Sequence, residues 1–330
     1  MPLDPQRQSA LLQAKARALV RDQFGEADRV ASTFPGGASL IEAGTGWVLV
    51  EESAVRSLGA VISWAKHNQL DDTHLLAEDG SEVLARRAQQ FTRPPHIWCV
   101  DGRRLCPAQP AAPPVDVPLP PSMQQLAELL READLEVVLE HGVLTGEVRG
   151  LEVARAVEDA DGGVHLEVGV GRFDREAGAI LHADLPRIDA LRAAAELVRR
   201  HRQAGSSDHP ISRLAPERWL RSVIIEQPGL VGAAELEAVA TTLTRRNLRE
   251  PHPAAAVGTT GGGERVIVLC SVGVDLDLVP AAADVRAARD PRARLVLALP
   301  ERDMHPALLA LAAELKDPPQ LVGLDASWRD

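Results

Sequence analysis

The sequence predicts an α/β protein in which a strand–helix–strand–helix–strand unit occurs twice, once near each end of the chain. The first reason is that the same order of apolar patterns appears before residue 106 and again after residue 210. The second is a match between residues 94–101 and 318–325, where a double proline, an apolar strand and an Asp follow at equal spacing. We interpret the match as a duplication, or as two copies of one fold. The alternative is that such an order recurs in any α/β protein.

The composition places the chain among globular proteins and narrows its partners. Its 330 residues suit two or three domains, and 45% hydrophobic with 25% charged residues is ordinary for packed cores. Aromatic residues make up only 3%, so stacking platforms for single-stranded nucleic acid are hard to build. The net charge of -11 disfavours broad attraction to phosphate backbones, although a local basic face remains open.

Cysteine usage and hydropathy predict a cytoplasmic protein without a membrane partner. Cys99, Cys106 and Cys270 are odd in number and form no CxxC pair, which disfavours a disulfide framework and a zinc ribbon. No apolar run reaches 18 residues, and the N-terminal segment carries charges throughout, so neither a membrane span nor a signal peptide is expected.

The first module is expected over residues 1–106 and a linker over residues 107–121. Apolar spacing predicts helices over 9–24, 55–65 and 82–91, and strands over 37–42, 47–51, 73–77 and 97–100. The turn 43–46 makes the first two strands a hairpin. Seven prolines in the linker predict an extended, semi-rigid segment.

A middle segment, 122–209, and a C-terminal module, 210–330, follow. The middle segment is expected to hold a helix over 123–133, strands over 135–140, 147–157 and 164–170, and a helical stretch over 174–202 broken by Pro186. In the C-terminal module the glycine turn 261–263 joins strands 254–258 and 266–270. Helices over 276–288 and 307–315 then alternate with strands over 295–299 and 321–324.

The middle hairpin carries the residues that most suggest chemistry. Alternation puts Glu152, His165 and Glu167 on one face of adjacent strands, just before a charged helix start at residues 172–176. Two carboxylates so placed could hold Mg²⁺ or Mn²⁺, which would activate water for phosphodiester hydrolysis. The alternative is a wet sheet face on which Glu and Arg side chains pair across strands.

Residues 216–325 carry a family resemblance. The helix opening Glu217-Arg218-Trp219-Leu220, the turn 228–232, the hairpin strands and residues 275–279 together resemble the PD-(D/E)xK nuclease superfamily, most of all its mismatch and single-strand junction endonuclease branch. The resemblance implies restriction-endonuclease-like αβββαβ modules, duplicated at the N- and C-termini around the middle hairpin and its helices. It also implies a centre with an Asp on the first hairpin strand and Glu-x-Lys on the next.

The catalytic residues of that family do not carry over to the C-terminal module. Ala255, Ala256 or Val257 stands at the position of the Asp, and Leu269-Cys270-Ser271 replaces Glu-x-Lys. Of the family's residues only Glu217 is retained, as the match to the helix Glu.

The other two segments are degenerate as well. In the N-terminal module Glu42 and Glu51 lie near the expected strands, but Ser53 stands where the Lys is needed. The middle hairpin offers Glu152 for the Asp and Glu167-Val168-Gly169 for Glu-x-Lys, so Arg172 or Arg175 would have to supply the cation.

Arginines concentrate between residues 187 and 249 of this acidic chain. If they share a face they could contact phosphates, and the candidates are Arg199, Arg200, Arg218, Arg221 and Arg246. The alternative is that they lie on solvated helix faces and pair with Glu and Asp.

Three functions follow from these observations. The first is a catalytically degenerate nuclease-like protein that acts as a scaffold or interaction module, with DNA metabolism as one setting. Its expected partner is another protein or a second copy of itself, and nucleic acid is a further candidate partner. The second is a Mg²⁺- or Mn²⁺-dependent nuclease with Glu152 and Glu167 as metal ligands, Arg175 stabilising charge and Glu217 assisting. The third is a small-ligand-binding sensor. No cofactor is assigned outside the nuclease alternative.

Overall fold

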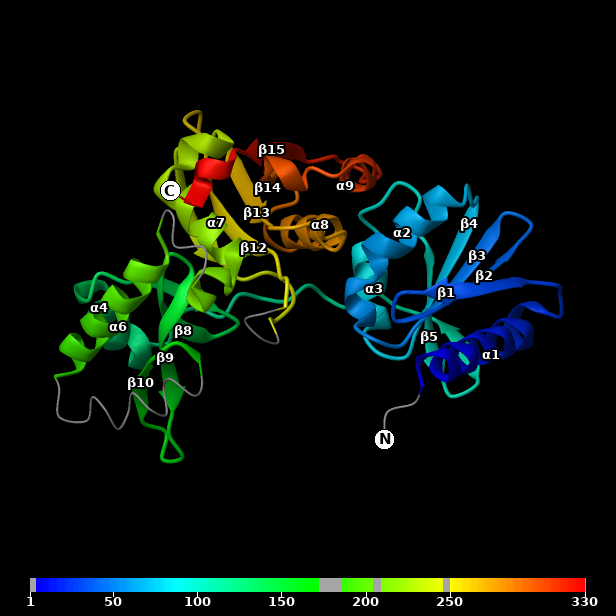
Figure 1. Ribbon diagram of the computed structural model, residues 1–330, viewed down its shortest axis with the longest axis horizontal. Coiled ribbons are helices and arrows are strands. Elements are labelled where there is room, and N and C mark those ends of the chain that lie inside the picture. The colour runs from blue at the N-terminus through cyan, green and yellow to red at the C-terminus, as the bar shows by residue number, and fades with distance from the viewer. Residues whose placement is uncertain (1–3, 172–185, 204–208, 246–249, 330) are drawn as a thin grey trace. The chain divides into compact units, whose positions relative to one another are not determined.

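The computed structural model describes residues 4–171, 186–203, 209–245 and 250–329, and it confirms a mixed α/β fold with three sheets (Figure 1). The chain divides into two compact units. Unit 1 comprises Met1–Pro113, Leu276–Ala287 and His305–Pro319, and unit 2 comprises Pro114–Asp275, Ala288–Met304 and Gln320–Asp330. None of the helices in the described part of the chain has the length and apolar character that a membrane span needs.

The sheet of unit 1 has the order β1-β2-β3-β4-β5-β6. Its strands are β1 (Val30–Phe34), β2 (Gly37–Glu42), β3 (Thr45–Val50), β4 (Asp72–Ala77), β5 (His96–Asp101) and β6 (Arg104–Pro107). The pairs β3–β4 and β4–β5 are parallel, and the other three pairs are antiparallel. The predicted strands are present, whereas β1 and β6 were not predicted, because both are short and mostly exposed at the sheet edges.

Helices cover both faces of this sheet. Helix α1 (Pro5–Phe24) packs on one face, where Leu19, Leu40 and Leu49 belong to one apolar cluster. Helices α2 (Leu58–His67) and α3 (Ser81–Ala88) follow β3 and β4 and lie on the opposite face (Figure 1). The core is aliphatic, as the composition predicts, with one aromatic cluster around Trp47.

Unit 1 also contains two helices from the C-terminal part of the chain, α8 (Leu278–Arg289) and α9 (Pro306–Ala312). Of α8, the residues up to Ala287 belong to unit 1. An isolated antiparallel bridge joins Phe91 to Leu315. The Thr92 N–H donates to the Glu314 carbonyl and the Lys316 N–H donates to the Gln90 carbonyl, each at 2.9 Å. The two bonds are reciprocal, since each segment donates one and accepts one. Both segments lie shortly before a double proline, at 94–95 and at 318–319.

A buried group of charges accompanies these helices, and we call it the unit 1 ion cluster: Arg56, Arg86, Arg87, Asp277 and Asp284. The Arg86 Nε lies 2.8 Å from Asp284, and the Arg87 Nη1 lies 3.1 Å from Asp277. Arg87 and Asp284 are each 1% exposed, so these charges depend on one another rather than on water.

In unit 2 the middle segment forms an antiparallel sheet with the order β10-β9-β8-β7. Its elements are α4 (Gln124–Glu132), β7 (Glu136–Glu140), β8 (Val143–Val148), β9 (Leu151–Glu158), β10 (Val164–Val168) and α6 (Arg187–His201). The helices cover one sheet face, where Leu130, Leu144 and Leu191 are fully buried. Helix α6 begins directly after Pro186, its N-cap residue, where the sequence predicts a break, and residues 174–185 of the predicted helical stretch lie outside the described ranges.

The prediction of a single strand over 147–157 is wrong. The chain turns at Arg149 and Gly150, whose φ values of 48° and 71° give the left-handed pair that suits a two-residue hairpin. Glycine is required at the second position, since a Cβ there would lie 2.2 Å from the Arg218 carbonyl carbon. The turn at His141 and Gly142, between β7 and β8, has the same signs of φ.

The C-terminal sheet of unit 2 has the order β11-β12-β13-β14-β15. Its elements are α7 (Pro216–Glu226), β11 (Glu235–Val239), β12 (Ala254–Thr259), β13 (Arg265–Cys270), β14 (Arg294–Pro300) and β15 (Gln320–Leu324). Two antiparallel pairs are followed by two parallel pairs, as in β1 to β5. Strand β11 was not predicted. The shared order agrees with two copies of one fold, and duplication itself stays a prediction.

Candidate functional site

The positions that the sequence resemblance would assign to a nuclease centre lie in the core of unit 2. Ala255, Leu269 and Cys270 have no exposed surface, and Val257 is 5% exposed. Burial raises the pKa of the Cys270 thiol to about 12, so this thiol stays protonated and unreactive at neutral pH. These strands therefore offer neither a carboxylate nor an ammonium to a scissile phosphate.

Glu217 lies in the first turn of α7 and is 1% exposed. It forms an ion pair with Arg245 at 2.7 Å. Burial raises its pKa although Arg245 opposes the shift. Through this buried ion pair, Glu217 connects helix α7 to the segment that carries Arg245.

The N-terminal module brings an ammonium to its strand ends, which the sequence did not reveal. Lys15 on α1 forms ion pairs with Glu51 and, at 2.7 Å, with Glu78. All three side chains are about a third to a half exposed. Glu42 pairs with Arg29 at 2.9 Å. Lys15 was missed because it comes from a helix far earlier in the chain than the strand residues.

Glu152 and Glu167 lie on the same face of the middle sheet, as predicted, and Arg155 lies between them. A register shift at Gly146 and Glu147 turns Glu152 to the face that carries Arg155. The Arg155 Nε and Nη2 donate to the two Glu152 oxygens at 2.9 and 2.7 Å, and Arg155 is the cross-strand partner of Glu167. Arg155 thus binds Glu152 within strand β9 and lies opposite Glu167 on strand β10. Arg175 lies outside the described residues.

No group of three or more His, Cys, Asp or Glu side chains is arranged to hold a metal ion within the ranges that the structure describes. Metal binding by Glu152 and Glu167 therefore remains a prediction that rests on the sequence pattern.

Arg218 and Arg221 take part in a second buried group of charges, the α7 ion cluster: Glu140, Glu147, Arg218 and Arg221. Arg218 and Arg221 each form ion pairs with both carboxylates. Glu147 lies 2.6 Å from the Arg218 guanidinium and 3.2 Å from the Arg221 guanidinium. Glu147 is fully buried and Arg221 is 1% exposed. Burial opposes ionisation of Glu140, but the two arginines outweigh it and hold its pKa at about 2. These two arginines are bound within the fold instead of facing phosphates.

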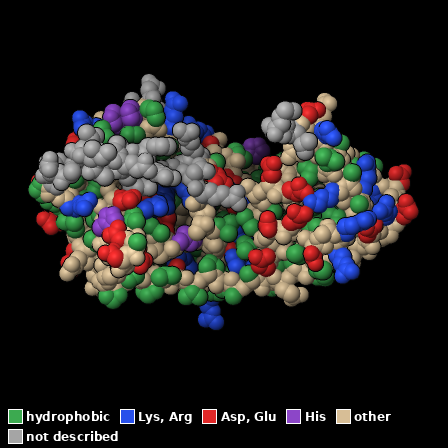
Figure 2. Space-filling model, turned by 90° about the horizontal axis from the view of Figure 1, so that it is seen from below, with side chains coloured by type: hydrophobic (Ala, Val, Ile, Leu, Met, Phe, Trp, Pro, Cys, Tyr) green, Lys and Arg blue, Asp and Glu red, His purple; other side chains and the backbone are tan. Residues whose placement is uncertain are grey.

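Helix α7 thereby joins the two sheets of unit 2. It packs on β11, β12 and β13, and its arginines hold β7 and β8 of the middle sheet (Figure 1). Ser222 on the same helix donates to Glu136 at 2.7 Å. On the face shown in Figure 2, Lys and Arg side chains are mixed with Asp and Glu wherever that face is described, without a continuous basic stripe.

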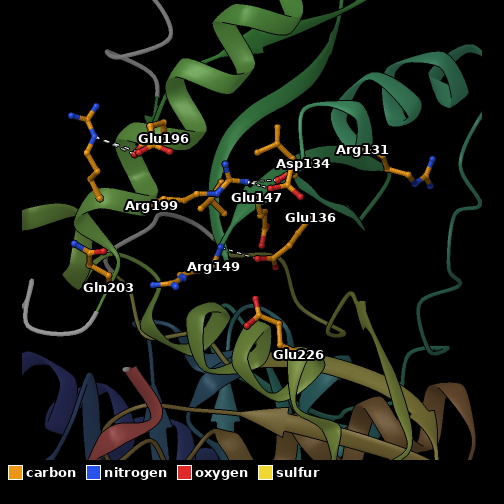
Figure 3. Close-up of a pocket in the computed structure, with 12 residues that line it drawn as sticks. Arg131, Asp134, Glu136, Glu147, Arg149, Glu196, Arg199, Gln203 and Glu226 are labelled. Atoms are coloured by element: carbon orange, nitrogen blue, oxygen red, sulfur yellow. Dashed lines mark hydrogen bonds and ion pairs between the residues drawn. The ribbon is translucent and has the colours of Figure 1, made fainter.

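Arg199 and Arg200 line a cavity of about 580 Å³ at the end of the middle sheet (Figure 3). We call it the polar cavity. Its basic lining residues are Arg131, Arg149, Arg199 and Arg200. Its acidic lining residues are Asp134, Glu136, Glu147, Glu196 and Glu226. The volume lies in the range of small-molecule sites. Arg246, the fifth predicted phosphate contact, lies outside the described residues.

Glu136 is the titrating group of this cavity. Its Oε1 accepts hydrogen bonds from the Ser222 hydroxyl at 2.7 Å and from the Arg149 N–H at 2.8 Å. Burial first, and then the charge of Glu147, raise its pKa to about 7. A carboxyl group that changes charge near neutral pH in a cavity is a candidate functional group.

Arg149 is held from two sides at the tip of the β8–β9 turn. Its N–H bonds to Glu136, and its guanidinium donates to the Arg202 carbonyl oxygen. Neither Glu136 nor Arg149 was predicted as a site residue, because they come from different strands and belong to no motif. The dipeptide Arg149-Gly150 was the available signal, since a large cationic residue rarely occupies such a turn.

We expect a Glu136→Gln variant to lose a pH dependence of stability. The raised pKa of Glu136 means that its favourable contribution is present below its ordinary value of 4.5 and is lost as pH rises to about 7. The free energy of unfolding of the wild type should thus fall relative to Glu136→Gln by about 3 kcal/mol across that window. Urea unfolding at pH 4.5 and 8 measures the difference. Parallel pH profiles of the two proteins would contradict the assignment.

A comparison with known protein families, curated proteins and solved structures gives no match to this chain. The resemblance to the PD-(D/E)xK superfamily accordingly rests on the residues of the sequence alone.

Proposed function

We propose that this chain is a non-catalytic binding protein and that the polar cavity of unit 2 is the site where it holds a small charged ligand. The cavity carries the proposal: about 580 Å³ is enclosed by side chains of both signs that come from α4, β7, β8, α6 and α7. Ligand sites are concave and use placed polar groups to fix the orientation of the ligand, and this cavity offers such groups from several elements.

The core of the C-terminal module supports the non-catalytic part of the proposal. Where hydrolysis would need an acid and an ammonium, Ala255, Leu269 and Cys270 are buried among aliphatic side chains. In the middle sheet, Arg155 already satisfies the Glu152 carboxylate. A nuclease-like scaffold that has kept its fold and uses it for binding accounts for both observations.

A thermal-shift experiment with a cavity-blocking variant tests the proposal. The probes are AMP, succinate, spermidine and glucose, together with single- and double-stranded oligonucleotides. At least one small charged probe should raise the melting temperature by about 2 to 4 °C or more at saturation. The effect should be lost in Glu226→Trp, because Glu226 points toward the cavity from the end of α7 (Figure 3). Glu128→Trp, on an exposed position of α4, is the matched control and should respond like the wild type.

Two outcomes would contradict the proposal. The first is that no small probe binds, or that Glu226→Trp binds as well as the wild type. The second is Mg²⁺- or Mn²⁺-dependent cleavage of DNA or RNA that disappears in Glu167→Ala, which would instead favour the nuclease alternative.

A further inference from the structure

The charges that line the polar cavity are not evenly paired. Asp134 binds Arg199 at 2.6 Å and Glu196 lies 4.0 Å from Arg200, while Glu147 belongs to the α7 ion cluster. Among the lining residues, Arg131, Arg149 and Glu226 make no ion pair with any part of the chain that the structure describes. These three side chains carry two positive charges and one negative charge, and the raised pKa of Glu136, about 7, weakens the negative charge of that carboxyl group near neutral pH.

Arg149 is the better placed of the two unpaired arginines. In Figure 3 the Arg131 side chain extends away from the other lining residues, whereas Arg149 lies among them. Its guanidinium bonds to the carbonyl oxygen of Arg202, which leaves further N–H donors of the fork for a ligand. The anchor is therefore fixed in place before a ligand arrives, which lowers the entropic cost of binding.

The guanidinium of Arg149 is held by a second arginine, Arg202, which is itself a buried cation. Arg202 is fully buried, donates at 2.7 Å to the Leu214 carbonyl and has its guanidinium 4.6 Å from the Trp219 ring centroid. Burial lowers the pKa of Arg202 to about 9, against the opposing negative charges of Glu147 and Glu136 and with smaller contributions from Arg329 and Arg149. An anion bound at Arg149 would act together with Glu147 and Glu136 to favour the charged form of Arg202.

The backbone of Arg149 is strained, as is that of His141 in the β7–β8 turn. Its φ of 48° lies in the left-handed region, which costs a non-glycine residue free energy and which Asn and Gly adopt more readily. Asn can therefore replace Arg149 in this turn without a loss of backbone stability, which makes the side chain open to a clean test.

We propose that the polar cavity binds a ligand with an oxyanionic group, a carboxylate or a phosphoryl group, and that the Arg149 guanidinium anchors this group. A planar fork of N–H donors matches two oxygens of either group. Glu226, on the facing helix end, is placed to accept from an ammonium or hydroxyl group elsewhere on the same ligand. The assignment rests on the proposed function of the cavity and specifies its ligand class.

Titration calorimetry with inorganic phosphate, AMP, succinate and spermidine tests the assignment. At least one oxyanion should bind with a dissociation constant of millimolar or lower. Binding of phosphate and AMP but not succinate would indicate a phosphoryl ligand, and the reverse would indicate a carboxylate ligand. Comparing the affinity for phosphate with that for AMP distinguishes the free ion from a phosphate ester. Arg149→Asn should bind at least about tenfold more weakly while its melting temperature stays at or above that of the wild type, because Asn suits the turn. Arg149→Lys, which keeps the charge without the fork, should fall between the two.

His141→Asn is the matched control. His141 occupies the corresponding position of the β7–β8 turn, with a φ of 52°, and does not line the cavity. It should bind like the wild type. Binding of spermidine alone would keep the proposed function and overturn the oxyanion assignment, and equal binding by wild type and Arg149→Asn would overturn it as well. If no probe binds, the proposed function fails together with this assignment.

Discussion

An Arg221→Leu variant is expected to unfold with a free energy about 3 to 5 kcal/mol below that of the wild type. The reason is that Glu140 and Glu147 would remain buried with a single cation, Arg218. Arg221 is 1% exposed and Glu147 is fully buried, so water cannot replace the lost partner. Urea unfolding followed by circular dichroism measures the change, and the exposed Arg292→Leu serves as the control.

A second substitution separates charge from packing in this experiment. Adding Glu147→Leu to Arg221→Leu leaves one carboxylate and one guanidinium in the α7 ion cluster. A substantial part of the lost stability should then return, because the buried charges balance again. If the double variant is less stable than Arg221→Leu, the loss arises from packing and the electrostatic account is incorrect.

The unit 1 ion cluster should show a strong asymmetry between its acidic and basic members. It contains three guanidinium groups, from Arg56, Arg86 and Arg87, and two carboxylates, from Asp277 and Asp284. Replacing Asp284 by Leu leaves three cations around one anion and should cost about 3 to 5 kcal/mol. Replacing Arg56, the most exposed of the three arginines, by Leu leaves two guanidinium groups and two carboxylates in the cluster. This change should lower the free energy of unfolding by about 1 kcal/mol.

The comparison of Asp284→Leu with Arg56→Leu is the measurement that decides this point. In both variants one charged residue of the same cluster is replaced by Leu, so the two losses of stability can be compared directly. Equal losses for the two variants would mean that packing, and not the excess of positive charge, sets the cost.

The regular parts of both α/β modules could be predicted from sequence. Strands β12 and β13 follow from aliphatic runs on either side of a glycine turn, and β4 and β5 from short apolar runs between helical patterns. Strands β4, β12 and β13 contain consecutive buried residues, so hydrophobicity alone identifies them, and β5 has buried residues at Ile97 and Val100. The edge strands β1, β6 and β11 were missed because their exposed positions carry polar side chains, which look like loop residues.

The middle sheet shows where single-sequence reasoning fails. The Arg149-Gly150 turn contains neither Asn nor Asp, so residues 147–157 read as one strand. This error also concealed the site, because the turn brings the Arg149 N–H to Glu136. The polar cavity joins residues from five elements, and its assembly depends on tertiary packing that periodicity does not encode.

The reciprocal contact between residues 90–92 and 314–316 bears on how the protein emerges from the ribosome. Arg86 and Arg87 leave the ribosome well before their acidic partners, Asp284 on α8 and Asp277 just before it, which lie 190 to 198 residues further along the chain. At about 5 to 20 residues per second, that interval is roughly 10 to 40 seconds. Through this period the nascent N-terminal module carries guanidinium groups without these acidic partners, and residues 90–92 lack their backbone partners. A truncated product that stops before α8 would lack two helices of unit 1.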